Sequence, residues 1–94
     1  MAMYPFSTLA DETLITYSHL IEENNEKIVY VHFERPTNDG FDSIRCRLPS
    51  YEWTVKEGRY TSEEIAMFER MLRDGAHIFY ELAEAGGFDF ANAV

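Results

Sequence analysis

The side chains best suited to chemistry lie in a segment that is predicted to be a β-strand. His32 and Glu34 are two residues apart in a run rich in β-branched and aromatic residues, so both point to one face of that strand. A histidine beside a carboxylate can act as an acid–base pair, and Tyr17 is expected on the same face. Because such pairs are common on exposed strands without chemistry, a small-molecule binder or enzyme is an alternative rather than the main prediction.

The other nucleophiles and metal ligands form no recognisable site in the sequence. His19, His32 and His77 lack metal-ligand spacing, with no paired cysteine and no histidine pair at i and i+4. Cys46 falls on the predicted core face, where it would be a small buried hydrophobic side chain rather than a nucleophile. The sequence has no phosphate-binding glycine loop and no nucleophile elbow. We therefore predict no catalytic residue, no cofactor and no metal, and a protein that is not an enzyme.

The elements that position these residues begin with five strand-like segments. They are Met3–Thr8, Leu14–Ile21, Lys27–Glu34, Phe41–Leu48 and Tyr51–Val55. Asn24-Asn25 suits a two-residue hairpin turn, because asparagine tolerates a positive φ. Ala10–Glu12 and Lys56–Gly58 are predicted turns. Arg35–Gly40 is a predicted loop, because it combines Pro, Asn, Asp and Gly.

One long helix is predicted over Ser62–Ala85. Thr61-Ser62-Glu63-Glu64 matches a capping box, in which Thr61 accepts from the first turn and Glu64 reaches back to the backbone of Thr61. Gly86-Gly87 is the predicted stop. Apolar residues recur along the helix at spacings of three and four: Ile65, Phe68, Leu72, Gly75, Ala76, Phe79, Leu82 and Ala83.

The turn at Asn24-Asn25 sets the expected strand register and therefore the two faces of the sheet. The expected core face holds Leu20 opposite Val29, Ser18 opposite Val31, Thr16 opposite Phe33, and Ile44, Cys46 and Leu48 on the third strand. The helix stripe would cover this face, and a one-residue slip would exchange the faces. We predict one α+β domain over residues 1–94, in which an antiparallel sheet of three to five strands packs on one C-terminal helix in two layers.

The opposite face is the candidate binding surface, because it collects aromatic, histidine and arginine side chains that are typical of interface cores. The expected members are Ile15, Tyr17, His19, Tyr30, His32, Glu34, Phe41, Arg45 and Arg47. Tyr17 is expected opposite His32, and His19 opposite Tyr30. We select Tyr17, His19, Tyr30, His32, Glu34, Arg45 and Arg47 as partner-binding candidates. Two alternatives are that the aromatic pairs simply stabilise the sheet, or that the N-terminal segment or a second copy covers this face.

Composition restricts the class of partner. The 94 residues include 17 acids and 8 bases, which gives a formal net charge of -9. This charge opposes direct binding to nucleic acid and to anionic membranes, and it favours a basic protein partner. The lone Cys46 and the lack of a long apolar segment indicate a cytoplasmic protein.

Five of the acids fall within sixteen residues of one another. Asp11, Glu12, Glu22, Glu23 and Glu26 fall in a segment without Lys or Arg. Carboxylates spaced like phosphates can occupy the nucleic-acid groove of a basic enzyme. The simpler alternative is that these acids are solvated turn residues.

Three segments carry a family resemblance: His32-Phe33-Glu34-Arg35-Pro36, Leu48-Pro49-Ser50-Tyr51-Glu52-Trp53 and Gly86-Gly87-Phe88. Through them the chain resembles short uncharacterised proteins from integrative mobile elements of gut bacteria. The resemblance implies a mobile-element context and no functional residues. The order of strands and helix is also similar to that of HicB-type antitoxins, although their glycine- and proline-rich strand signature and a DNA-binding segment after the helix are missing.

These patterns favour a non-enzymatic, acidic protein-interaction module. The leading hypothesis is a bacterial mobile-element accessory that binds a basic protein partner, as a mimic of nucleic acid would. One alternative is a HicB-like antitoxin that neutralises a small basic toxin. The others are a homodimer formed through the outer sheet face, and a small-molecule binder or enzyme that uses the His/Tyr face.

Overall fold

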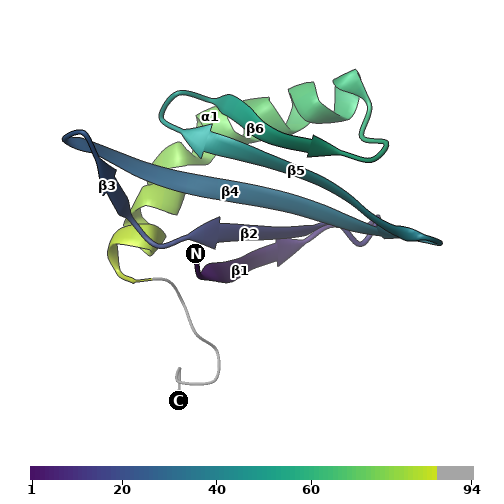
Figure 1. The fold of residues 1–94 in the computed structure, drawn as a ribbon, viewed down its shortest axis with the longest axis horizontal. Coiled ribbons are helices and arrows are strands. Elements are labelled where there is room, and N and C mark those ends of the chain that lie inside the picture. The colour runs from purple at the N-terminus through teal and green to yellow at the C-terminus, as the bar shows by residue number, and fades with distance from the viewer. Residues whose placement is uncertain (87–94) are drawn as a thin grey trace, which may run out of the picture.

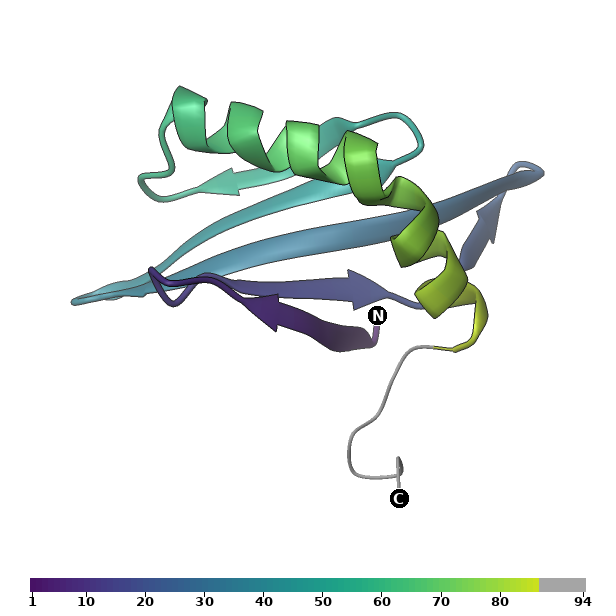
Figure 2. The same ribbon diagram turned by 180° about the vertical axis from the view of Figure 1, so that it is seen from behind.

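The protein folds as a twisted sheet with one helix packed against it, in a computed structural model that describes residues 1–86. The elements are β1 (Met3–Thr8), β2 (Leu14–Ser18), β3 (Ile21–Glu23), β4 (Glu26–Thr37), β5 (Gly40–Leu48), β6 (Glu52–Glu57) and α1 (Ser62–Glu84). The helix lies behind the strands in Figure 1 and in front of them in Figure 2. The predicted α+β class is therefore confirmed.

The sheet is antiparallel and has six strands in the order β1-β2-β4-β5-β6, with β3 paired to the beginning of β4. The expected number of three to five strands was too low. The difference arises because the single strand expected over Leu14–Ile21 is two strands, β2 and β3. An irregular step at Ser18-His19-Leu20 separates them.

This step also overturns the expected register of β2. The turn at Asn24 and Asn25 forms with φ of 50° and 64°, and it pairs Ile21 with Ile28 as a two-residue hairpin requires. Beyond the step the register has shifted by one residue, so Tyr17 lies opposite Val31 and not opposite His32. The Ser18 hydroxyl accepts a hydrogen bond from the Tyr30 N–H at 2.9 Å, which satisfies a backbone donor where the ladder is interrupted.

The shift exchanges the faces of β2 and leaves those of β4 and β5 as predicted. Ile15 and Tyr17, expected on the outer face, are each 1% exposed and belong to the core. Thr16, expected in the core, is half-buried opposite His32. The exchange is physically reasonable, because it buries an isoleucine and a tyrosine in place of a threonine.

The hairpin between β4 and β5 is longer than the sequence indicated. Most of the loop expected over Arg35–Gly40 is strand, because β4 continues to Thr37 and β5 begins at Gly40. Arg35 lies opposite Asp42, and Pro36 lies opposite Phe41. The strand at the other side of β5, expected over Tyr51–Val55, is β6 and runs from Glu52 to Glu57.

The helix matches its prediction within one residue. Thr61 is the N-cap, and its hydroxyl accepts from the Glu64 N–H at 3.1 Å while Glu64 Oε1 accepts from the Thr61 N–H at 3.0 Å. The helix is followed by Gly86, which has a φ of +85°. Gly87, part of the predicted helix stop, and Phe88, part of the family resemblance, lie outside the described residues.

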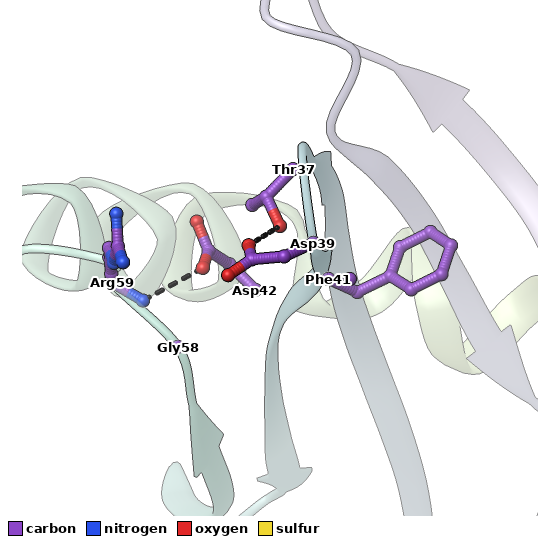
Figure 3. A pocket seen from close by; sticks show the side chains of 7 residues that line it. Thr37, Asp39, Phe41, Asp42, Gly58 and Arg59 are labelled. Carbon is purple, nitrogen blue, oxygen red and sulfur yellow. Dashed lines mark hydrogen bonds between the residues drawn. The ribbon is translucent and has the colours of Figure 1, made fainter.

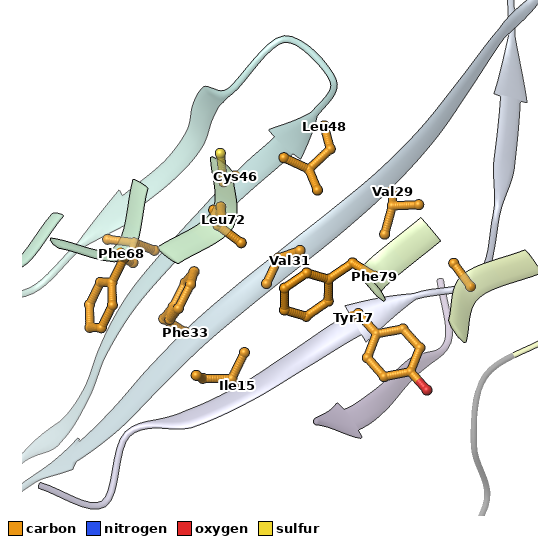
Figure 4. Packing of buried hydrophobic residues seen from close by; sticks show 12 residues of the cluster. Ile15, Tyr17, Val29, Val31, Phe33, Cys46, Leu48, Phe68, Leu72 and Phe79 are labelled. Atoms are coloured by element: carbon orange, nitrogen blue, oxygen red, sulfur yellow. The ribbon is translucent and has the colours of Figure 1, made fainter. Parts of the chain in front are cut away.

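The core lies between α1 and the sheet, as Figure 4 shows. The Phe33 and Phe68 rings stack with centroids 4.3 Å apart, and the Phe79 ring meets Tyr17 at 6.2 Å. Cys46 is fully buried, as predicted, and burial raises the pKa of its thiol to about 12. The thiol therefore packs as an apolar group at neutral pH.

Candidate functional site

The outer face of the sheet, defined as the side turned away from α1, is organised in rows of residues that lie opposite one another on neighbouring strands. The Arg45 row contains Thr16, His32, Arg45 and Val55. The Ser43 row, one step along the strands, contains Leu14, Glu34, Ser43 and Glu57. Within the described residues no element covers these rows, and most of their side chains are half-buried by their neighbours.

Arg45 is the central cation of this face. Its Nε donates to Nδ1 of His32 at 3.4 Å, and its Cζ lies 6.0 Å from the centroid of the Tyr30 ring. Among the described residues, the half-buried arginines Arg35 and Arg47 form ion pairs with carboxylates, whereas Arg45 forms none. The guanidinium is thus held in place by neutral neighbours, and its terminal nitrogens can receive an anion from outside.

His32 is kept neutral by its surroundings. Burial lowers the pKa of its imidazole, and the adjacent charge of Arg45 lowers it further. The carboxylates of Glu34 and Glu57 act in the opposite direction and are outweighed. A neutral ring can accept the hydrogen bond from Arg45, which fixes the orientation of the guanidinium.

The outer face contains most of the predicted binding residues but not all of them. Tyr30, His32, Glu34, Arg45 and Arg47 lie on it, as expected from β4 and β5. The placement of Tyr17 was wrong, because this side chain is buried in the core. His19 is exposed, but it lies in the step between β2 and β3 and does not pair with Tyr30. The two expected aromatic pairs, Tyr17 with His32 and His19 with Tyr30, are therefore absent from the described structure.

Arg47 differs from Arg45 in being neutralised within the chain. Its Nη2 pairs with Glu26 at 2.8 Å, and its Nη1 donates to Ser50 at 3.1 Å. Because its charge is already matched by Glu26, Arg47 is a weaker candidate for contact with a partner than Arg45.

Arg35 is a prominent residue that lies in the predicted loop Arg35–Gly40 and was not among the predicted binding residues. Its guanidinium pairs with Asp11 at 3.2 Å, Asp42 at 2.9 Å and Glu64 at 2.7 Å. It also lies over the Tyr60 ring at 4.3 Å. Arg35 thereby ties the β1–β2 turn, the β4–β5 hairpin and the first turn of α1 together. Extending β4 past Glu34 would have placed Arg35 opposite Asp42 and revealed the pair.

Hydrogen bonds within this cluster shift the pKa values of its charged groups. Hydrogen bonds from Arg35 are the main cause of the lowered pKa of Asp42. The pKa of Glu64 is lowered first by the Thr61 N–H and then by Arg35, and the pKa of the Arg35 guanidinium is raised. All three carboxylates are engaged by donors from within the chain, so the cluster serves to hold elements together.

A shallow pocket of about 200 Å³ opens beside this cluster (Figure 3). It is lined by Thr37, Asp39, Gly40, Phe41, Asp42, Gly58 and Arg59. Asp42 is 4% exposed, and its Oδ1 accepts from the Arg59 N–H at 2.9 Å. Gly58 has a φ of +95°, and a Cβ there would overlap Asp42 Oδ1, so only glycine lets the backbone approach the carboxylate. His32 is not part of this pocket.

The acidic residues noted in the sequence form two separate groups. Asp11 lies beside Arg35, whereas Glu26 lies at the opposite end of β4, about 30 Å away at ~3.4 Å per residue. Figure 1 shows the β3–β4 hairpin and the β1–β2 turn at opposite ends of the sheet. Asp11 and Glu26 are both engaged in ion pairs. These acids therefore do not line one continuous surface.

Two general features of residues 1–86 complete the description. No group of three or more His, Cys, Asp or Glu side chains in this range is arranged to hold a metal ion. No helix in the same range is both long and apolar enough to cross a membrane.

In comparisons with known proteins, no family model matches the sequence, and neither a curated protein nor a solved structure is found to be similar to it.

Proposed function

We propose that this protein is a non-enzymatic interaction module that binds protein through the outer face of its sheet. The observation that supports the proposal is Arg45, a half-buried arginine beside Tyr30 and neutral His32 with no carboxylate partner among the described residues. Arginine and tyrosine are the residue types that most often dominate binding energy at protein interfaces. A partner carboxylate would complete the set of contacts around Arg45.

The arrangement of the acids supports the outer face over the acidic turns as the binding surface. The two groups of acids lie in the β1–β2 turn and the β3–β4 hairpin, at opposite ends of the sheet, so they form no single row of carboxylates spaced like phosphates. The net charge of -9 favours a partner with a basic rim, because a strong negative charge speeds encounter with positive surfaces. The resemblance to mobile-element proteins makes a cytoplasmic protein of a bacterial host the partner to seek.

The proposal is tested by affinity purification with a matched pair of charge variants. The tagged chain is co-expressed with an untagged copy in a bacterial host, purified at low salt after nuclease treatment, and analysed by quantitative mass spectrometry. Arg45→Ser removes the central cation of the outer face. Arg70→Ser makes the same chemical change on the exposed surface of α1, where Arg70 has no hydrogen bond or ion pair with any of residues 1–86.

The wild type and Arg70→Ser should each recover one protein in stoichiometric amount, either a host protein or the untagged copy. Arg45→Ser should recover at least about tenfold less of that protein, which is the usual effect of losing an interface arginine. Equal recovery by all three chains would contradict the proposal, as would recovery of the tagged chain alone.

A further inference from the structure

We infer that the occupant of the outer face is a second copy of this chain, packed sheet on sheet about a twofold axis with Arg45 of each copy facing Glu34 and Glu57 of the other. The inference rests on the proposed function, because it assigns a partner to the same face.

The charges on the outer face are segregated into adjacent rows. The Arg45 row carries a cation without a carboxylate partner among the described residues. The Ser43 row carries Glu34 and Glu57 on either side of the small Ser43 side chain, and neither carboxylate forms an ion pair within residues 1–86. The two rows are two residues apart along each strand, which is about 7 Å.

Twofold symmetry brings these rows together. Consider two stacked sheets with a twofold axis in the plane between them. If this axis runs perpendicular to the strands and midway between the two rows, it places the Arg45 row of each copy opposite the Ser43 row of the other. Arg45 of one copy then faces Ser43 of the other, with Glu34 and Glu57 to its two sides. Sheets stack about 10 Å apart, which an extended arginine spans together with a facing glutamate. Symmetry makes the contact twice, so Arg45 of each copy lies beside Glu34 and Glu57 of the other.

The apolar side chains on the same rows supply the remaining contact. Leu14, which is 37% exposed, and the half-buried Val55 lie at the two sides of the face. The outer face spans five strands at ~4.8 Å spacing with about six residues each, which gives a flat area of roughly 500 Å². The side chains that project from the sheet make the area available for contact larger than this. A standard interface buries about 800 Å² per partner, so a dissociation constant in the micromolar range is expected. The net charge of -9 on each copy opposes association and also favours a moderate affinity.

The test is sedimentation velocity on the purified full chain at about 100 µM, well above a micromolar dissociation constant. The variants are Arg45→Glu, Glu34→Arg and the control Arg70→Glu, each checked for folding by circular dichroism. The wild type and Arg70→Glu should sediment as dimers. Arg45→Glu and Glu34→Arg should each raise the dissociation constant at least about tenfold, because like charges then meet across the axis.

An equal mixture of Arg45→Glu and Glu34→Arg provides the decisive sample. One copy then has arginine at both positions and the other has glutamate at both, so both contacts are restored, and the mixture should sediment as a heterodimer. Formation of that heterodimer also shows that each variant is folded. A charge-neutral variant, Arg45→Ser, should also raise the dissociation constant, because it removes the attraction without adding a like charge.

Two results would overturn the inference. One is a wild-type chain that is monomeric at about 100 µM, well above the expected dissociation constant. The other is a wild-type dimer that forms while the mixture stays monomeric, which would place the interface elsewhere. If the wild type is monomeric and yet captures a host protein in an Arg45-dependent way, the inference fails while the proposed function stands.

Discussion

Arg35 and Arg45 show how one type of side chain has two roles on neighbouring strands. Arg35 is surrounded by three carboxylates and a tyrosine ring from the same chain, so its binding capacity is used in holding the fold together. Arg45 is oriented by His32 and Tyr30, and no carboxylate of the described chain pairs with it. Local alternation in the sequence was sufficient to place Arg45 on the outer face. It could not place Arg35, because its partners come from three separate elements.

Neutral His32 makes stability depend on pH in a definite direction. The pKa of the His32 imidazole is lowered in the folded protein. Between that lowered pKa and about 6.5, the ordinary histidine value, the unfolded chain therefore binds more protons than the folded protein. The free energy of unfolding should therefore fall as the pH falls below about 6.5, and it should be fully retained above that value. Urea titrations of the wild type between about pH 7.5 and pH 5.5 measure the slope.

The matched variants are His32→Asn and His77→Asn. His32→Asn should reduce the pH dependence, since it removes the titrating ring, and His77→Asn is the control because it makes the same substitution on the exposed side of α1. The same slope in the wild type and both variants would show that the folded protein does not lower the pKa of His32.

At the scale of elements, the sequence was informative wherever a pattern was long or a turn was chemically distinctive. The helix was predictable because its capping box and apolar spacing extend over many turns. The Asn24-Asn25 turn was predictable from its tolerance of positive φ. The register of β2 was not, because the slip at Ser18-His19-Leu20 has no glycine or proline to mark it. The available signal was hydrophobicity, since Ile15 and Tyr17 are better core residues than Thr16 and Ser18.

Phe68 tests the packing of α1 on the sheet. Its ring is 1% exposed and stacks on Phe33, so Phe68→Ala leaves a cavity in the middle of the core. The free energy of unfolding should fall by about 3–5 kcal/mol, the usual range for truncating a buried aromatic residue. The matched control is Met67→Ala, because the neighbouring Met67 is 47% exposed and its truncation should cost less than about 0.5 kcal/mol. Similar losses in the two variants would mean that the helix presents a different face to the sheet.

At the scale of the whole molecule, the two layers leave the sheet with one covered and one open face. The covered face is apolar, and the open face carries aromatic residues, separated charges and an arginine without a counterion among the described residues. The sequence predicted both the class of fold and an open face on β4 and β5. It could not show the order of rows across four strands, because that order depends on the slip in β2 and on the pairing of β6. The self-complementary charge pattern is therefore visible only in the assembled sheet.

The most direct test of docking on the outer face is a dilution series of the isotope-labelled wild-type chain by two-dimensional NMR, from about 100 µM to about 1 µM, which spans the expected micromolar dissociation constant. Docking of a second copy should produce concentration-dependent shifts at the amides of Tyr30, His32 and Arg45. Those on the exposed side of α1, such as Met67 and Arg70, should stay fixed. Shifts confined to α1, or spectra that do not change over the whole range, would contradict docking of a second copy on the outer face.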